Sequence, residues 1–410
     1  MSDFDRLAKS LASGVLDNAD KDKCTLVING KEIPAVSATI KRSIESCVDG
    51  FNATIAMSLD YKDPPVRAYG YEKCEVYLGS NLVITGVIYT SDIDYNINGY
   101  SANIEGSSIP TDLIDSEFFP PYDMNQITLP EIAQSIIDRL GIDIEVEVKP
   151  YDINNEFFER IDIDESDTML NLLHDLALQR GILVLSTKEG NLLLTRTNDA
   201  GKPVCVIGDE KNPLSNVRAK FDGRKRFNKY RAYATSPLRV QVDTKKRRKK
   251  SYRTYTQYRS IVILDNEVPE TRQTSCKADD NAITEEEKAA AYSQKRAYAD
   301  SLEIKIPVNS WYIFGKEELW EENTLVTLQH PAIFLKNGFD MLIREVTYTF
   351  NSDGCTAVLD VVPPQCYSDK IIPTGIFSED GASALDTALA NIGIGDGIQG
   401  VPDEWVESHR

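Results

Sequence analysis

The chain has 410 residues, of which 41% are hydrophobic and 27% charged, and its formal net charge is -19. This length exceeds what one hydrophobic core usually supports and predicts two to four domains. The excess of acid disfavours general nucleic-acid binding, and no apolar run approaches the roughly 20 residues that span a bilayer. We therefore expect a folded, multi-domain protein with no stable membrane insertion.

Residues 22–108 read as a first β-barrel domain, preceded by an N-terminal extension over residues 1–21. Short alternating runs such as CTLVI, KCEVYLG and LVITGVIYT are typical of strands, and turn signals such as Asn29-Gly30 separate them. No helical pattern intervenes. Strands at this spacing predict an antiparallel barrel or sandwich.

Residues 109–207 predict a small α+β domain. Thr128-Leu-Pro-Glu131 forms a capping box before an apolar stripe that ends at Gly141, which predicts a first helix. A second helical pattern follows Asp164-Glu-Ser-Asp167 and stops at Gly181. Two strand runs, ILVLST and NLLLTRT, come next, so this domain is inserted between β-rich halves.

Residues 208–366 return to strand-like runs and predict a second β-barrel domain. It carries a basic loop at 243–259 and a helical insertion at 284–301, which the sequence Thr284-Glu-Glu-Glu287 caps. The residues after it, 367–410, are rich in glycine and acid and are expected to form a docking tail.

The two β regions share a faint repeat. Val87-x-Tyr89-Thr90 with a later Gly99-x-Ser101-Ala102 is echoed by Val346-x-Tyr348-Thr349 with Gly354-x-Thr356-Ala357. Each copy predicts one hairpin, and a true duplication would give the chain two copies of one barrel. Hairpins of unrelated origin also look alike, so both explanations stay open.

No catalytic, cofactor-binding or metal-binding residue is predicted. His174 lies in a helical pattern without a nucleophile motif nearby, and the glycines at 395, 397 and 400 lack the preceding strand of a dinucleotide site. Glutamates beside Trp320 could suggest a sugar-cleaving pair, but adjacent glutamates in a polar connection are far commoner. These are Glu317, Glu318, Glu321 and Glu322.

The strongest local feature of the sequence is a cluster of basic residues. Between Arg218 and Ser260 there are sixteen Lys and Arg against two acids. Its centre is a candidate partner-binding site, where cations next to tyrosines could hold phosphates and stack bases. A solvated loop that meets an acidic partner is favoured, because the rest of the chain repels DNA. The site comprises Lys245, Lys246, Arg247, Arg248, Lys249 and Lys250.

The seven cysteines are scattered, odd in number and free of any C-x-x-C pair, which indicates reduced thiols made in a cytosol. The N-terminal stretch lacks the apolar core of a signal peptide, so no export is expected.

Seven runs, taken in order, carry a resemblance that covers about Cys24 to Pro364. They resemble the baseplate hub protein of Mu-like contractile-tailed bacteriophages, and also the hub part of contractile secretion-system spikes. The runs are IKRSIES, ITGVIYTSDIDY, IEGSSIPTDLIDSE, LPEIAQSIIDRLGI, ESDTMLNLLHDLALQRGILVLSTKEGNLLLTR, FDGRKRFNKYRAYA and LWEENTLVTLQHP.

The resemblance implies a structural protein without cofactors, present in the virion tail baseplate and assembled in the host bacterial cytoplasm. It implies a homotrimer whose two barrels per chain make a pseudo-sixfold ring. The implied partners are the tail spike protein, tail tube or tube-initiator proteins and baseplate wedge proteins. DNA would be a transient passenger in an acidic lumen.

Three alternatives remain at this point. The chain could be the hub of a bacteriocin or secretion-type contractile particle, which shares the architecture. It could bind nucleic acid through the basic loop, which would make affinity fall steeply with salt. It could also be an envelope-degrading tail enzyme, which a peptidoglycan turnover assay would reveal.

Overall fold

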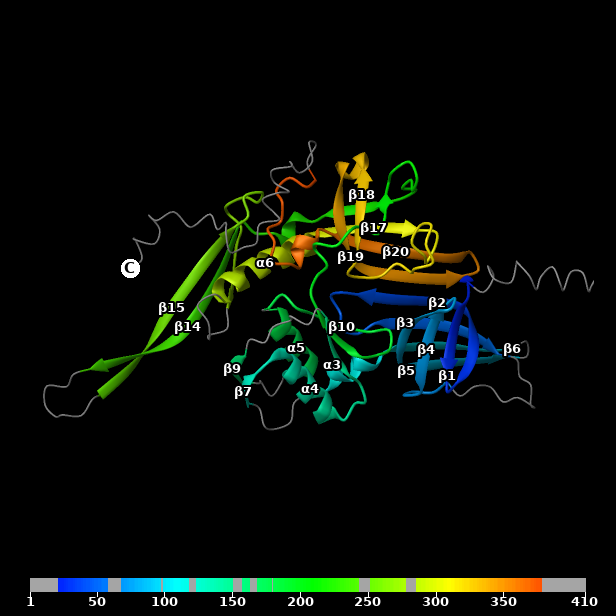
Figure 1. The fold of residues 1–410 in the computed structure, drawn as a ribbon, viewed down its shortest axis with the longest axis horizontal. Coiled ribbons are helices and arrows are strands. Elements are labelled where there is room, and N and C mark those ends of the chain that lie inside the picture. Colours follow the sequence, from blue (N-terminus) through cyan, green and yellow to red (C-terminus); the bar gives the residue numbers. More distant parts are fainter. Residues whose placement is uncertain are drawn as a thin grey trace, which may run out of the picture.

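The computed structural model describes residues 21–57, 68–96, 99–117, 123–149, 157–162, 168–178, 180–242, 251–277 and 285–377. Strands dominate these residues, and the helices gather in the middle of the chain and before its last strands (Figure 1). None of the helices in these ranges is long and apolar enough to cross a membrane. The predicted fold class, mainly β with an α+β part between two β units, is confirmed.

The first β unit is a closed six-stranded barrel. Its strands pair in the order β1-β4-β5-β6-β3-β2, and β2 also pairs with β1 to close the barrel. Alternate residues such as Leu26 and Ile104 are fully buried, as the alternating pattern predicts. The predicted turn at Asn29 and Gly30 joins the first two strands with φ of 52° and 76°. The strands are β1 (Cys24–Ile28), β2 (Lys31–Ser43), β3 (Gly50–Met57), β4 (Lys73–Leu78), β5 (Asn81–Asn96) and β6 (Gly99–Ser108).

The middle unit mixes helices with short strands around its own core. Both predicted helices are present as α4 and α5, and α4 begins at the predicted capping box of Thr128 and Glu131 and ends before Gly141 at φ 66°. Its elements are η2 (Ile109–Thr111), α3 (Asp112–Asp115), β7 (Asp123–Ile127), α4 (Leu129–Leu140), β8 (Val146–Lys149), β9 (Phe158–Asp162), α5 (Met169–Leu178), β10 (Leu183–Ser186) and β11 (Leu192–Thr195).

The second β unit repeats the strand order of the first. Its strands pair as β12-β18-β19-β20-β17-β13, so the first to sixth strands of each unit occupy the same positions. One direction differs, because β12 pairs parallel with β18 whereas β1 pairs antiparallel with β4. The pairing path ends at β12 and β13, and among the described residues no pairing joins these two strands. The strands are β12 (Val206–Ile207), β13 (Arg218–Phe221), β17 (Leu302–Val308), β18 (Leu325–His330), β19 (Leu335–Asn351) and β20 (Gly354–Val362).

This shared order bears on the sequence echo. Each half of the echo falls on one antiparallel hairpin, β5–β6 in the first unit and β19–β20 in the second, as predicted. The hairpins also occupy the same place in the two strand orders. Two unrelated hairpins have no reason to share the order of four further strands, so the fold favours duplication of one barrel.

A long hairpin interrupts the second unit between β13 and β17. Strands β14 (Lys229–Val242) and β15 (Ser251–Leu264) pair along their whole length, and β16 (Gln273–Lys277) pairs with the base of β14. The hairpin extends far from the rest of the molecule, and α6 (Glu285–Ser301) packs near its base (Figure 1). The 3-10 turns η3 (Gly223–Lys225), η4 (Pro331–Ile333) and η5 (Pro364–Cys366) complete the second half.

The two β units join into one continuous sheet. Residues 38–43 of β2 pair antiparallel with residues 345–350 of β19, which places Ile40 opposite Tyr348. Both side chains are buried in a core that the two units share. The first and second units are therefore held by backbone hydrogen bonds as well as by apolar burial.

Close packing within the first barrel gives a testable prediction. A Cβ atom at Gly86 would lie 2.0 Å from the Ser107 carbonyl oxygen of the paired strand, so Gly86→Ala must force the β5–β6 ladder apart. We expect a loss of about 1–3 kcal/mol in the free energy of unfolding, measured by urea denaturation. Gly50→Ala is the matched control, because a Cβ there meets no atom within 4 Å. Equal stabilities of the two variants would contradict the strand register.

Candidate assembly interface

Arg42 is a buried cation at the point where three parts of the chain meet. Its Nη1 donates to the Val83 carbonyl oxygen at 3.0 Å in the first barrel, and its Nη2 donates to the Ser186 carbonyl oxygen at 3.3 Å in the middle unit. The same Nη2 lies 2.7 Å from Glu322 Oε1 in the second β unit, and Nε lies 3.3 Å from Asp49 Oδ2. Only 5% of the Arg42 side chain is exposed. This one side chain therefore ties all three units together.

The surroundings of Arg42 keep it charged. Burial alone would lower the pKa of Arg42, but Glu322 and Asp49 raise it above its usual range. Burial raises the pKa of Asp49 to about 7, although Arg42 opposes this rise. The cost of burying Arg42 and Glu322 is offset only while both are present, so the junction is sensitive to the loss of either.

Arg344 forms a second buried pair on the neighbouring strand. It lies on β19, and its Nη2 is 2.9 Å from Asp360 Oδ2 on β20. It also donates to the carbonyl oxygens of Ala299 and Leu302, which fixes the end of α6 against the sheet. Glu45 adds an ion pair with Arg296 of α6 at 2.8 Å. The base of the long insertion is thus held to both β units.

The glutamates considered as a sugar-cleaving pair are engaged in separate ion pairs. Trp320 is fully buried, and its carbonyl oxygen accepts a hydrogen bond from the Tyr348 hydroxyl. Only Glu322 of this group belongs to the central junction. The pairs are Glu317 with Lys21, Glu318 with Lys316, Glu321 with Lys188 and Glu322 with Arg42.

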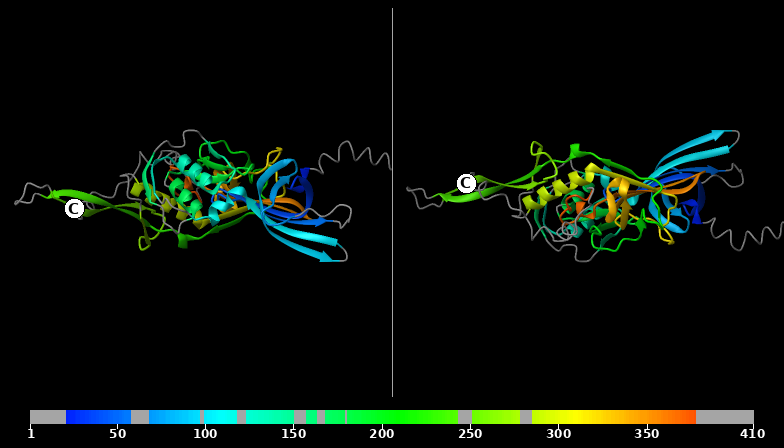
Figure 2. Two further views of the ribbon diagram at one scale, coloured as in Figure 1. Left: turned by 90° about the horizontal axis from the view of Figure 1, so that it is seen from below. Right: turned by 90° about the horizontal axis from the view of Figure 1, so that it is seen from above.

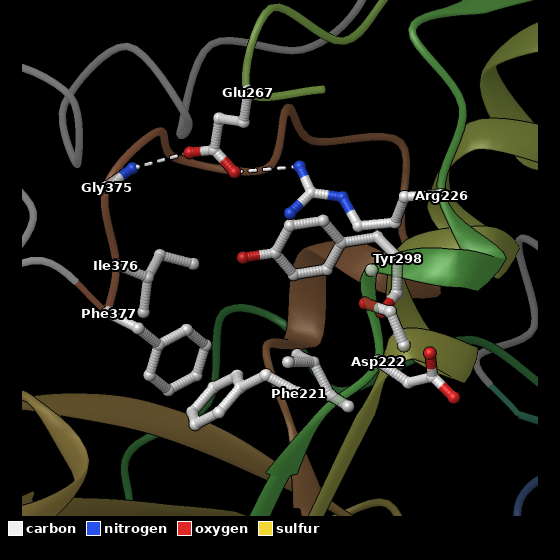
Figure 3. A pocket seen from close by; sticks show the side chains of 11 residues that line it. Phe221, Asp222, Arg226, Glu267, Tyr298, Gly375, Ile376 and Phe377 are labelled. Atoms are coloured by element: carbon white, nitrogen blue, oxygen red, sulfur yellow. Dashed lines mark hydrogen bonds and ion pairs between the residues drawn. The ribbon is translucent and has the colours of Figure 1, made fainter. Parts of the chain in front are cut away.

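A cavity of about 350 Å³ lies beside the end of β13 (Figure 3). Its charged residues are already paired, because Glu267 accepts from Arg226 at 2.7 Å and from the Gly375 backbone N–H at 3.0 Å. Apolar side chains, among them Phe221 and Phe377 with ring centroids 5.0 Å apart, form much of the remaining lining. Asp222 also lines the cavity and forms an ion pair with Arg224 at 2.7 Å. The chain segment at 375–377 thus packs against the second unit.

The other predicted residues have different outcomes. The basic cluster Lys245 to Lys250 lies outside the described residues, between the end of β14 at Val242 and the start of β15 at Ser251. His174 lies on α5, where burial lowers its pKa. In the described part of the chain, no group of three or more His, Cys, Asp or Glu side chains is placed to hold a metal ion.

Sequence reasoning missed the two buried arginines. A usable signal was present for Arg42, because it has the same parity as buried Ile40 in a strand whose alternate residues face the core. A charged residue at an apolar parity indicates a buried ion pair. Its partners Asp49 and Glu322 lie 7 and 280 residues away, so no local pattern could identify the second of them.

The buried pair predicts a pH effect on stability. Folded Asp49 keeps its proton up to about pH 7, whereas the unfolded chain releases it near pH 4, so ionisation costs the native chain stability as pH rises through this window. Asp49→Asn removes this cost. We therefore expect the free energy of unfolding of the variant, relative to the native chain, to rise between pH 4 and 7, by a few kcal/mol at most.

The measurement is urea denaturation at several pH values, with Asp353→Asn in an exposed hairpin turn as the control. A difference between Asp49→Asn and the native chain that stays constant with pH would contradict the buried position of Asp49.

Two family models match the chain in separate places. Residues 111–196 match the second domain of the baseplate hub protein gp44-like family, and residues 282–370 match the fourth domain of the Mu phage baseplate assembly protein GpP. The baseplate hub protein gp44 of Escherichia phage Mu is 23% identical over 364 residues, which cover 85% of this chain and 91% of that protein.

Solved structures extend this similarity to the fold. The 43 kDa tail protein of prophage MuSo2 from Shewanella oneidensis is 26% identical with a TM-score of 0.68, and the match covers 84% of this chain and all of that one. A tail protein from Neisseria meningitidis has the same fold, with 17% identity, a TM-score of 0.67 and coverage of 88% and 98%. Along most of its length the chain is thus similar to baseplate hub and tail proteins of Mu-like phages.

Proposed function

We propose that the chain is the structural hub at the centre of a contractile-tail baseplate, where three copies form a ring between the tail tube and the central spike. The observation that carries this proposal is the repeated strand order of the two β units. Three chains with two similar units each would supply six near-equivalent positions. Such a ring meets a sixfold tube on one side and a threefold spike on the other.

The proposed role is mechanical, and the site chemistry supports it. The buried charges of Arg42 and Arg344 form ion pairs that hold parts of the structure together. The cavity beside β13 likewise has its charged groups paired. We infer that the protein has no reaction of its own and acts through its contacts with tube, spike and baseplate wedge proteins. Its place is then the virion tail, after assembly in the host bacterial cytoplasm.

DNA would pass through such a ring without binding firmly. The outward face of the joined sheet carries side chains of both signs that alternate with core-facing residues, and several are paired, such as Lys41 with Glu345 at 2.8 Å. If this face lines the channel, its charge is nearly balanced and less acidic than the composition of the chain suggests. The acids are Asp92, Asp94, Glu105, Glu303 and Glu345, and the bases are Lys41, Arg218, Lys220 and Lys305.

The mass of the particle in solution tests the ring. We expect multi-angle light scattering after gel filtration to give three times the 45.9 kDa of one chain at micromolar concentration. Addition of the spike protein should then give one complex of fixed stoichiometry. A chain that stays monomeric both alone and with its spike protein would overturn the trimeric hub.

The basic cluster gives a separate prediction. We assign it to an acidic protein partner, so replacing all six residues from Lys245 to Lys250 with Gln should leave duplex-DNA binding at physiological salt unchanged, by fluorescence anisotropy. Six lost phosphate contacts would instead weaken binding by orders of magnitude and flatten its salt dependence. The second outcome would favour the nucleic-acid-binding alternative.

A further inference from the structure

Two strand edges are open within the described residues. β13 pairs with β17 on one side, and no described strand pairs with its other side. β5 pairs with β4 only up to Val87, so its last residues pair with β6 alone. Figure 2 shows the end of the β5–β6 hairpin standing clear of the first barrel. Open edges of this kind bind a further strand unless they are protected.

The open end of β5 also exposes apolar side chains. Ile93 is 50% exposed and Tyr95 is 67% exposed. Acidic Asp92 and Asp94 alternate with them. A strand that alternates acid with large apolar residues in this way fits a partner strand that carries basic residues.

The strand order identifies which edges correspond. The eight strands of the joined sheet run β5-β6-β3-β2 and then β19-β20-β17-β13. If the two β units arose by duplication, these two runs of strands are two copies of one four-strand block. The contact that joins the blocks within the chain is β2 against β19. The same contact, continued past the end of the chain, would place β13 against β5 of another copy.

The register of this contact follows from the paired strands. Gly99 opposes Asn96 in the first hairpin as Gly354 opposes Asn351 in the second, so Ile93 occupies the position of Tyr348.

The matching register on the other strand comes from β3 and β17. Ala53 opposes Ile104 as Ile306 opposes Leu359, which aligns β3 with β17. In β2, Ala38 opposes Ala53, and in β13, Ala219 opposes Ile304. With β3 and β17 aligned, Lys220 in β13 therefore corresponds to Lys41 in β2.

The intrachain contact then serves as a template. Lys41 lies opposite Thr347 and Thr39 lies opposite Thr349. The corresponding residues place Lys220 opposite Asp92 of the neighbouring copy and Arg218 opposite its Asp94. Between these two pairs, Ala219 lies opposite Ile93. Opposite charges from distant parts of the sequence thus face each other at two successive outward positions of the paired strands.

We propose that β13 of one copy pairs antiparallel with the end of β5 of the next, in the register that sets Lys220 against Asp92 and Arg218 against Asp94. The pairing covers the exposed Ile93 and Tyr95 and closes both open edges. Cross-strand pairs of opposite charge contribute about 0.2–1 kcal/mol each, so burial and backbone hydrogen bonds supply most of the affinity. This contact rests on the trimeric ring proposed above.

Cysteine cross-linking tests the register. Arg218→Cys combined with Asp94→Cys in one chain should give covalent dimers and trimers on denaturing gels after mild oxidation, because directly opposed Cβ atoms lie about 4.5–5.5 Å apart. The matched control combines Arg218→Cys with Thr90→Cys, four residues along the same strand. The native chain, with its seven cysteines, controls for background.

Charge reversal tests the pairing independently. Lys220→Glu and Asp92→Lys should each raise the concentration needed for half-assembly, by roughly tenfold, and the double variant should recover most of the loss. Thermal melts of the monomers identify any variant that loses its fold. Lys220 Nζ lies 3.6 Å from Glu303 in its own chain, so recovery by Asp92→Lys is the informative result.

The outcomes separate this contact from the ring itself. Trimers that neither cross-link at residues 94 and 218 nor respond to the reversals would overturn the β13–β5 contact and leave the trimeric hub standing. A chain that stays monomeric at every concentration, with or without the spike, would overturn both.

Discussion

The antiparallel pairing of β2 with β19 is the constraint on which the rest of the structure depends. It converts two β units into one sheet and places Arg42 where the first barrel, the middle unit and the second β unit meet. Because Arg42 has carboxylate partners on both sides of the junction, separating the units would leave buried charges unpaired. The relative position of the units is therefore fixed by electrostatics as well as by packing.

Duplication explains why one junction can serve both folding and assembly. The contact within the chain buries an ion-pair network around Arg42, which suits a permanent connection. At the corresponding position of the proposed contact between copies, β13 carries Phe221 instead, which is 45% exposed. The charged residues of β13, Lys220 and Arg218, lie on the surface. A single copy is therefore not left with a buried unpaired charge before assembly. One sheet geometry is thus used twice with different chemistry.

The sequence predicted local features well and long-range features poorly. The capping box at Thr128 and the turn at Asn29-Gly30 are set by neighbouring residues, and both lie where the pattern predicted. The order of family-like segments predicted the two β units. The junction around Arg42 was missed, because Glu322 lies 280 residues away and was grouped instead with its neighbouring glutamates. Strand pairing between units depends on contacts that alternation alone does not specify.

In the proposed assembly, the two similar β units of each of three chains build a ring of six near-equivalent units. A cryo-electron microscopy reconstruction of the isolated protein would show whether this ring forms. We expect threefold particles in which the two β units of each chain superpose after a rotation near one sixth of a turn. Particles in which one β unit lies off the ring, or in which six chains each contribute one unit, would contradict it.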